Sequence, residues 1–184
     1  MITVLGIDQS LSCTGAVVVE HIPHQGEGKG ITSVEGLTAV RTSKTEAEDF
    51  VVDTYERSHI IGAKLVQLAE THKPDYVVFE TPSLASKGNA TRTLPLLLGS
   101  LIAQLEGTLS REGVKLLTVA PSSLKKFATG KGNATKDEMV LAVEGSNKEL
   151  YELLMNTTKA GGRFDVADAY WLAMWAIDKE NYHV

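Results

Sequence analysis

The sequence is poor in cysteine, because Cys13 is the only one in 184 residues. A single cysteine excludes an internal disulfide, a multi-cysteine zinc site and an iron–sulfur cluster, and we expect Cys13 to be a small buried residue. No apolar run approaches the roughly 18 residues that a membrane helix needs. The N-terminus lacks the basic lead and apolar stretch of a signal peptide. A cytoplasmic protein with no membrane partner fits these absences.

The chain also lacks an excess of basic charge, since its net charge is −5. The charges are unevenly distributed. Between Thr81 and Lys136 there are eight basic and two acidic residues, a net charge of +6, which leaves −11 for the rest of the chain. Such a segment is either a solvated face or a surface that binds a polyanion. Apolar content of 43% and charged content of 22% are ordinary for a globular domain.

Short apolar and β-branched runs predict five strands, over residues 3–8, 14–21, 33–41, 75–80 and 115–119. Helical patterns are expected over residues 47–72, 91–109, 122–128, 136–144, 148–156 and 164–179. We expect Pro74 to end the first helix, and Pro95 to lie in the first turn of the second, where proline is tolerated. Three antiparallel strands, followed by alternating helices and strands, predict an α/β fold. It would be a five-stranded mixed sheet flanked by helices, in one domain over residues 1–184.

Two carboxylates follow strands of this predicted sheet. Asp8 comes directly after Val-Leu-Gly-Ile, and Glu80 comes directly after Tyr-Val-Val-Phe. A charged side chain there costs free energy unless it is neutralised, and sites in such sheets form at the carboxyl ends of strands. Either residue alone is readily explained as a solvated acid or one bound by backbone amides. Two on the same rim favour a functional site.

A second pair of acids, Asp165 and Asp168, lies on one face of the predicted last helix because the two are three residues apart. Near a helix N-terminus such acids can simply complement the helix dipole, with Asp165 as a cap. If all four carboxylates cluster, their repulsion requires bound cations or shifted pKa values, and hard divalent cations prefer oxygen ligands. Two such ions about 4 Å apart would activate a water and stabilise the leaving 3′ oxygen of a phosphodiester. Asp8, central in the sheet, would bridge them.

Read in order, these residues resemble the RuvC family of Holliday-junction resolvases, within the RNase H-like (retroviral-integrase-like) fold. Residues 6–15 resemble the family's first strand and turn, and residues 77–82, Val-Val-Phe-Glu-Thr-Pro, resemble its fourth strand. Residues 165–169, Asp-Val-Ala-Asp-Ala, match its closing Asp-x-x-Asp-Ala motif, and residues 120–136 resemble its basic segment. The resemblance covers nearly the whole chain, with the four acids in the family's order.

The resemblance implies an endonuclease that cuts four-way DNA junctions, with flaps and forks as further branched substrates. It implies a homodimer with two active sites, in which Asp8, Glu80, Asp165 and Asp168 are the catalytic and metal-binding residues. Each site would hold two magnesium ions, for which manganese is expected to substitute. The residues expected to bind DNA phosphates are Lys87, Arg92, Lys125, Lys126, Lys131 and Lys136. The apolar helix over residues 94–105 would form either the dimer interface or part of the core.

Two features depart from the bacterial members of that family. The Gly-rich stretch at residues 25–30 is longer, and Leu84 stands where an aromatic wedge is expected after Glu80. Both fit a phage-type member with a broader preference for branched DNA, acting in a bacterial cell or a phage-infected host.

Two other function classes remain open at this stage. A nuclease of the YqgF or RNase H type would act on RNA, and cleavage of an RNA–DNA hybrid would identify it. Residues 6–8 and 14–15 also resemble the first phosphate loop of actin-like ATPases, which need two such lobes around the nucleotide. Thermal stabilisation by a nucleotide would identify that class.

Overall fold

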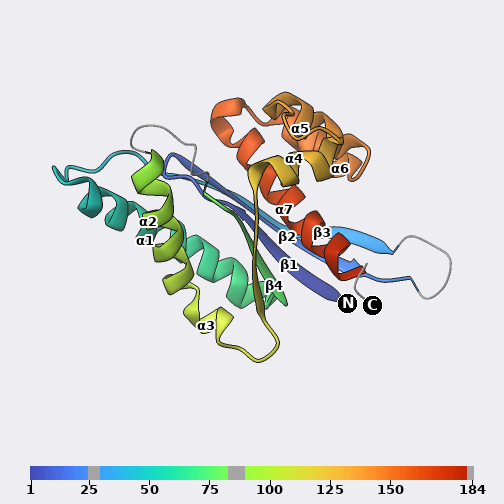
Figure 1. The fold of residues 1–184 in the computed structure, drawn as a ribbon, viewed down its shortest axis with the longest axis horizontal. Helices are drawn as coiled ribbons and strands as arrows, with labels where there is room; N and C mark the ends of the chain where they lie inside the picture. Colours follow the sequence, from blue (N-terminus) through green and yellow to red (C-terminus); the bar gives the residue numbers. More distant parts are fainter. Residues whose placement is uncertain (25–29, 83–89, 182–184) are drawn as a thin grey trace.

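A computed structural model of the protein describes residues 1–24, 30–82 and 90–181 (Figure 1). Its centre is a five-stranded sheet in the order β3-β2-β1-β4-β5. The strands are β1 (Ile2–Asp8), β2 (Cys13–Ile22), β3 (Ile31–Arg41), β4 (Tyr76–Glu80) and β5 (Lys115–Val119). β2 is antiparallel to β1 and β3, whereas β4 is parallel to β1 and β5. The predicted mixed sheet is confirmed. The Gly-rich residues 25–29 lie outside the described residues.

Helices cover both faces of the sheet (Figure 1). They are α1 (Phe50–His72), α2 (Ala90–Gln104), α3 (Glu106–Leu109), α4 (Pro121–Thr129), α5 (Lys136–Glu144), α6 (Lys148–Asn156), the short η1 (Lys159–Gly161) and α7 (Arg163–Asn181). Side chains alternate along each strand, so Leu5 and Ile7 pack with α1 and α2, whereas Val4 packs with α4 to α7. Burial on both faces explains why β1 and β4 are almost continuously apolar.

The first helix differs from the prediction at its start and agrees at its end. It begins at Phe50 because the Asp49 carboxylate accepts hydrogen bonds from the backbone N–H groups of Val51 and Val52. It ends at His72, followed by Lys73 in the left-handed conformation with φ 47°. Pro74 comes next, as a residue that cannot continue the helix.

The second predicted helix is divided in the structure. Leu105, with φ −85° and ψ 6°, separates α2 from α3. The prediction that Pro95 lies in the first turn is wrong, because α2 begins at Ala90 and Pro95 lies inside it. There it removes one intrahelical hydrogen bond. None of the helices in the described part of the chain combines the length and apolar character needed to cross a bilayer.

Candidate active site

The last helix lies directly on the sheet because two strands carry glycine where it crosses. A Cβ atom on Gly6 of β1 would lie 2.1 Å from the carbonyl oxygen of Ala169, and one on Gly15 of β2 would lie 2.1 Å from that of Asp165. Only a residue without a side chain allows such an approach. The first two turns of α7, which carry Asp165 and Asp168, are therefore held over the end of β1. Asp165 lies within the first turn, not at the cap position, because the helix begins at Arg163.

The four predicted acids form one electrostatic group in the structure. Burial, followed by the carboxylates of Asp168, Glu80 and Asp165, raises the pKa of Asp8 well above its usual value. Burial, followed by Asp168, raises the pKa of Glu80 to about 7. Burial is also the largest influence on Asp168, whose pKa rises to about 6. Repulsion between the acids contributes to each of these three pKa shifts, whereas the role of the four residues as metal ligands stays a prediction.

Two of the predicted DNA-binding lysines lie beside these acids. Lys136, the first residue of α5, partly offsets burial by lowering the pKa values of Asp8, Glu80 and Asp168. Lys125 of α4 does the same for Glu80 and Asp168. A capping box in which Thr135 and Glu138 bond each other's backbone N–H groups fixes the start of α5, and with it the position of Lys136.

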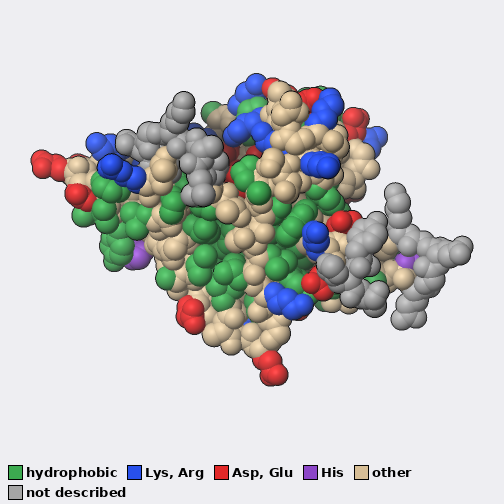
Figure 2. Space-filling view, in the orientation of Figure 1, with side chains coloured by type: hydrophobic (Ala, Val, Ile, Leu, Met, Phe, Trp, Pro, Cys, Tyr) green, Lys and Arg blue, Asp and Glu red, His purple; other side chains and the backbone are tan. Residues whose placement is uncertain are grey.

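The other basic residues predicted to bind DNA lie on different elements. Lys126 is exposed on α4, and Arg92 is exposed on α2, which covers the opposite face of the sheet. Lys131 is exposed and pairs with Glu138 at 3.1 Å. Lys87 lies outside the described residues, as does Leu84. Figure 2 shows Lys and Arg side chains gathered over helices α4 to α6. The basic segment over residues 81–136 supplies α4 and the first residue of α5, so it accounts for part of this group.

A cation that the sequence reading missed lies in the same region. Lys159 of η1 lies 5.1 Å from the ring centroid of Phe164, and Lys136 lies 5.6 Å from the same ring. Lys159 also pairs with Asp137 at 3.6 Å. It follows the basic segment by more than twenty positions in the chain, so only the fold of α5 and η1 brings it there.

Cys13, as predicted, is buried, with 6% of its surface exposed. It begins β2, and its thiol lies beside Asp165. Burial, followed by the charge of Asp165, raises the pKa of the Cys13 thiol to about 11, while Arg41 acts in the opposite direction. The thiol is therefore protonated at neutral pH and available as a weak hydrogen-bond donor to Asp165.

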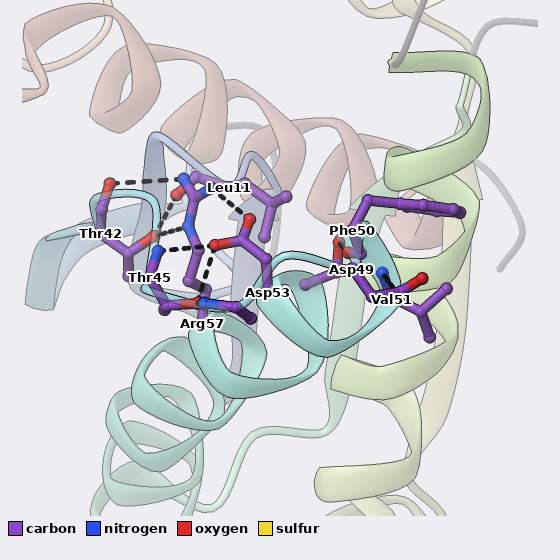
Figure 3. Close-up of polar contacts among 10 residues, drawn as sticks. Leu11, Thr42, Thr45, Asp49, Phe50, Val51, Asp53 and Arg57 are labelled. Atoms are coloured by element: carbon purple, nitrogen blue, oxygen red, sulfur yellow. Dashed lines mark hydrogen bonds and ion pairs between the residues drawn. The ribbon is translucent and has the colours of Figure 1, made fainter.

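The turn that follows Asp8 is anchored by α1 (Figure 3). Thr42 donates its hydroxyl to the carbonyl oxygen of Leu11, and Arg57 donates Nε–H to the Thr42 hydroxyl at 2.8 Å. Arg57 in turn pairs with Asp53 at 3.0 Å. A hydrogen bond from the backbone N–H of Thr45 lowers the pKa of Asp53. Burial acts in the opposite direction, and Arg57 lowers the pKa further. These contacts fix the loop between β1 and β2, and thus the end of β1.

The acids suit a divalent cation in chemical type, although they do not already form a closed metal shell. Among residues 1–24, 30–82 and 90–181, no three His, Cys, Asp or Glu side chains converge as metal ligands do. The donor set is nevertheless all carboxylate oxygen, which Mg²⁺ and Mn²⁺ prefer. Burial and repulsion both penalise these charges, so a bound cation would relieve both. The residues therefore fit such an ion in chemical type.

Comparison with protein-family models found no match. Comparison with curated proteins found relatives of nearly the same length. The crossover junction endodeoxyribonuclease RuvC of Salinispora arenicola is 30% identical over 171 residues, covering 93% of this chain and 85% of the relative. The protein of the same name from Synechococcus sp. (strain CC9311) is 29% identical over 171 residues, covering 93% of this chain and 95% of the relative.

Solved structures with a similar fold include Thermus thermophilus RuvC in complex with a Holliday junction substrate. It matches with a TM-score of 0.73 and 21% identity, over 99% of this chain and 96% of that one. The yeast mitochondrial Holliday junction resolvase Ydc2 matches with a TM-score of 0.64 and 20% identity, over 97% of this chain and 80% of that one. These likenesses confirm the expected RNase H-like fold class.

Proposed function

The chain belongs to the RuvC family of crossover junction endodeoxyribonucleases, and from this premise we propose that it resolves Holliday junctions by metal-dependent phosphodiester hydrolysis. The observation that carries the proposal is the electrostatic coupling of four carboxylates, which come from β1, β4 and α7. Asp8, Glu80, Asp165 and Asp168 are proposed as the catalytic residues and metal ligands. Residues 1–184 are proposed to form one nuclease domain.

The proposed cofactor is a pair of Mg²⁺ ions, with Mn²⁺ as a substitute. When bound, such ions supply an activated water and stabilise the charge that develops on the leaving oxygen. The protein's part is to present four carboxylates in their ionised form. Since burial and repulsion raise the pKa values of Asp8, Glu80 and Asp168, these residues release protons as they take up a cation. Cation binding is therefore expected to strengthen as the pH rises.

The lysines beside the acids have a separate proposed role. Lys125 and Lys136 carry positive charge next to Glu80 and Asp168, where the negative backbone of DNA would otherwise be repelled. They are proposed to hold the phosphate that is cut. Lys126 and Lys131, together with Arg92 and Lys87, are proposed to position the arms of the junction. Phosphate contacts of this kind orient DNA without reading its sequence.

The proposed partner is a second copy of the chain. A four-way junction has twofold symmetry, so two cuts of like polarity need two active sites related by a dimer axis. The exposed face of α1 supplies an apolar surface, with Tyr55 57% and Ile60 54% exposed. Leu96 of the neighbouring α2 is 37% exposed, while Leu97 and Leu101 of the same helix are buried in the core. Helix α2 would then serve both the core and the interface.

The activity is proposed to take place in the cytoplasm of a bacterial cell or a phage-infected host, since the curated relatives come from bacteria. Flaps and forks are proposed as further substrates. Cleavage of a matched panel tests the function: a four-way junction, a flap, a fork, a linear duplex and an RNA–DNA hybrid, each with Mg²⁺ or Mn²⁺. Symmetric nicking of the junction, with the duplex left intact, is expected. Preferred cutting of the hybrid would assign the protein to RNA-directed nucleases instead.

A further inference from the structure

Gln9 joins the two strand ends that carry the first two acids. The parallel pairing of β1 with β4 extends to Ile7 opposite Phe79. Beyond this last pair, a side chain links the two strand ends: Gln9 Nε2 donates a hydrogen bond to the backbone carbonyl of Glu80 at 2.5 Å. Gln9 directly follows Asp8 and is 6% exposed. A buried side-chain amide thus connects the residue next to Asp8 with the backbone of Glu80.

The other half of this amide has no partner in the part of the chain that the structure describes. Gln9 Oε1 is buried and accepts no hydrogen bond from the residues that the structure describes. Buried polar atoms are nearly always paired, and an unpaired one destabilises the fold. Rotating the amide would not help, because Oε1 would then face the Glu80 carbonyl, and two acceptors repel each other. The Gln9 amide is therefore oriented to bond the Glu80 carbonyl, and this orientation leaves Oε1 without a hydrogen bond.

We infer that Gln9 is a positioning residue, which holds the backbone of Glu80 against the end of β1 and so fixes the Glu80 carboxylate relative to Asp8. The inference rests on the proposed function and concerns the same site. Because Gln9 contacts the backbone carbonyl, this hydrogen bond occupies neither carboxylate oxygen of Glu80. Partners of this kind, one step removed from a metal, commonly change metal affinity or activity by about 10–100-fold when they are lost.

The variant Gln9→Met distinguishes a positioning role of Gln9 from a contribution to the stability of the fold. Methionine is similar in length and apolar, so the variant removes the unpaired Oε1 but leaves the Glu80 carbonyl without its donor. One unsatisfied acceptor is thus exchanged for another, and the melting temperature is expected to change by less than about 3 °C. The matched control is Gln104→Met in the interface of α1 and α2. Gln104 Nε2 donates to the carbonyl oxygens of Ser58 at 3.2 Å and Ser100 at 3.3 Å.

The readouts are Mn²⁺ binding by electron paramagnetic resonance, thermal unfolding without metal, and cleavage kinetics on a four-way junction. For Gln9→Met we expect Mn²⁺ affinity to fall about 10-fold or more and kcat to fall, with KM for the junction unchanged. For Gln104→Met we expect the reverse, a lower melting temperature with unchanged Mn²⁺ affinity.

Two results would overturn the inference. One is unchanged Mn²⁺ affinity in Gln9→Met. The other is a loss of melting temperature as large as that of Gln104→Met, which would make Gln9 merely structural. A wild-type protein that binds Mn²⁺ but cuts no branched DNA would refute the proposed function, while the Mn²⁺ comparison would still decide the role of Gln9. A wild-type protein that binds no Mn²⁺ would refute both.

Discussion

The carbonyl oxygen of Asp165 in α7 lies only 2.1 Å from the point that a Cβ atom on Gly15 of β2 would occupy. The backbone of one proposed catalytic residue thus rests directly on a strand. Gly15 is in turn paired with Asp8 across β1 and β2. Gly15 therefore contacts both the strand residue Asp8 and the helix residue Asp165, and so sets the position of one acid relative to the other.

Gly15→Ala is therefore expected to displace α7 and impair the site. The added methyl group meets backbone atoms, which cannot move aside as a flexible side chain would, so we expect a loss of stability of about 1–3 kcal/mol. Cleavage should fall further than stability alone explains, because Asp165 and Asp168 move together. Denaturant unfolding and cleavage assays measure the two effects. Gly99→Ala in α2, where no other described part of the chain outside that helix's backbone lies within 4 Å of the added atom, should leave cleavage unchanged.

Asp8→Asn should abolish cleavage without weakening the fold. Asp8 is the acid to which all three others couple, and its loss should reduce cleavage by at least about 100-fold, since even indirect partners of a metal account for 10–100-fold. Junction binding, measured by gel shift in Ca²⁺, should be retained. Because a buried acid that three other carboxylates repel is removed, the melting temperature of the metal-free variant should equal or exceed that of the wild type. Retained turnover in Mg²⁺ would contradict the metal assignment. Glu70→Gln, on the exposed surface of α1, is the control.

The stability of the metal-free protein should fall as the pH rises from about 4.5 to about 7. Since the pKa of Glu80 is raised from 4.5 to about 7 in the folded state, the folded protein holds a proton there that the unfolded chain has released. Stability from this proton is present below the unfolded pKa and is lost as the pH passes the folded one, by roughly 3 kcal/mol. Asp168, with a pKa raised to about 6, adds to the same trend.

Chemical denaturation at several pH values measures this slope. Glu80→Gln should flatten it, and saturating Mg²⁺ should reverse it, because a bound cation favours the ionised carboxylates. A metal-free protein whose stability rises between pH 5 and 7 would show that the pKa values of Glu80 and Asp168 are not raised in the folded state.

Replacing Lys131 and Lys136 together by alanine should weaken junction binding and flatten its dependence on salt. Each lost phosphate contact should reduce the slope of log K against log salt concentration by about 0.9. Lys131 already pairs with Glu138, so the larger share is expected from Lys136. Filter binding over a salt series measures the slope. Lys64→Ala on the exposed surface of α1 is the matched control, and an equal effect from it would place the DNA elsewhere.

Tyr55→Glu should convert a dimer into a monomer, because it puts a charge into the exposed apolar face of α1. Sedimentation equilibrium measures the assembly state. Leu153→Glu, at a site on α6 that is 48% exposed, should leave the dimer intact. The monomeric variant should nick single strands of a junction without paired cuts. A wild-type protein that is monomeric at micromolar concentration, with or without a junction, would refute the proposed interface.

Local sequence was enough to predict most elements. The strands could be identified because β-branched runs buried on both faces leave a continuous apolar signal, as in Val77 and Val78. The helices over Lys136–Glu144 and Lys148–Asn156 were predicted to the residue, since each begins with a capping side chain, Thr135 or Asn147. The break at Leu105 was not predicted because leucine is no helix breaker, and Pro95 lies past the first turn because α2 begins at Ala90, one residue before the predicted start.

The sequence by itself determined which acids belong together, since their order and spacing carried the family resemblance, and it determined that Asp165 and Asp168 share a helical face. Only the tertiary structure decided how closely that face approaches the sheet, because the contacts of Gly6 and Gly15 with α7 join residues more than 140 positions apart. It also decided the role we infer for Gln9. A glutamine next to an aspartate has no local signature, and its meaning depends on the carbonyl of Glu80, which the parallel pairing of β1 and β4 brings beside it.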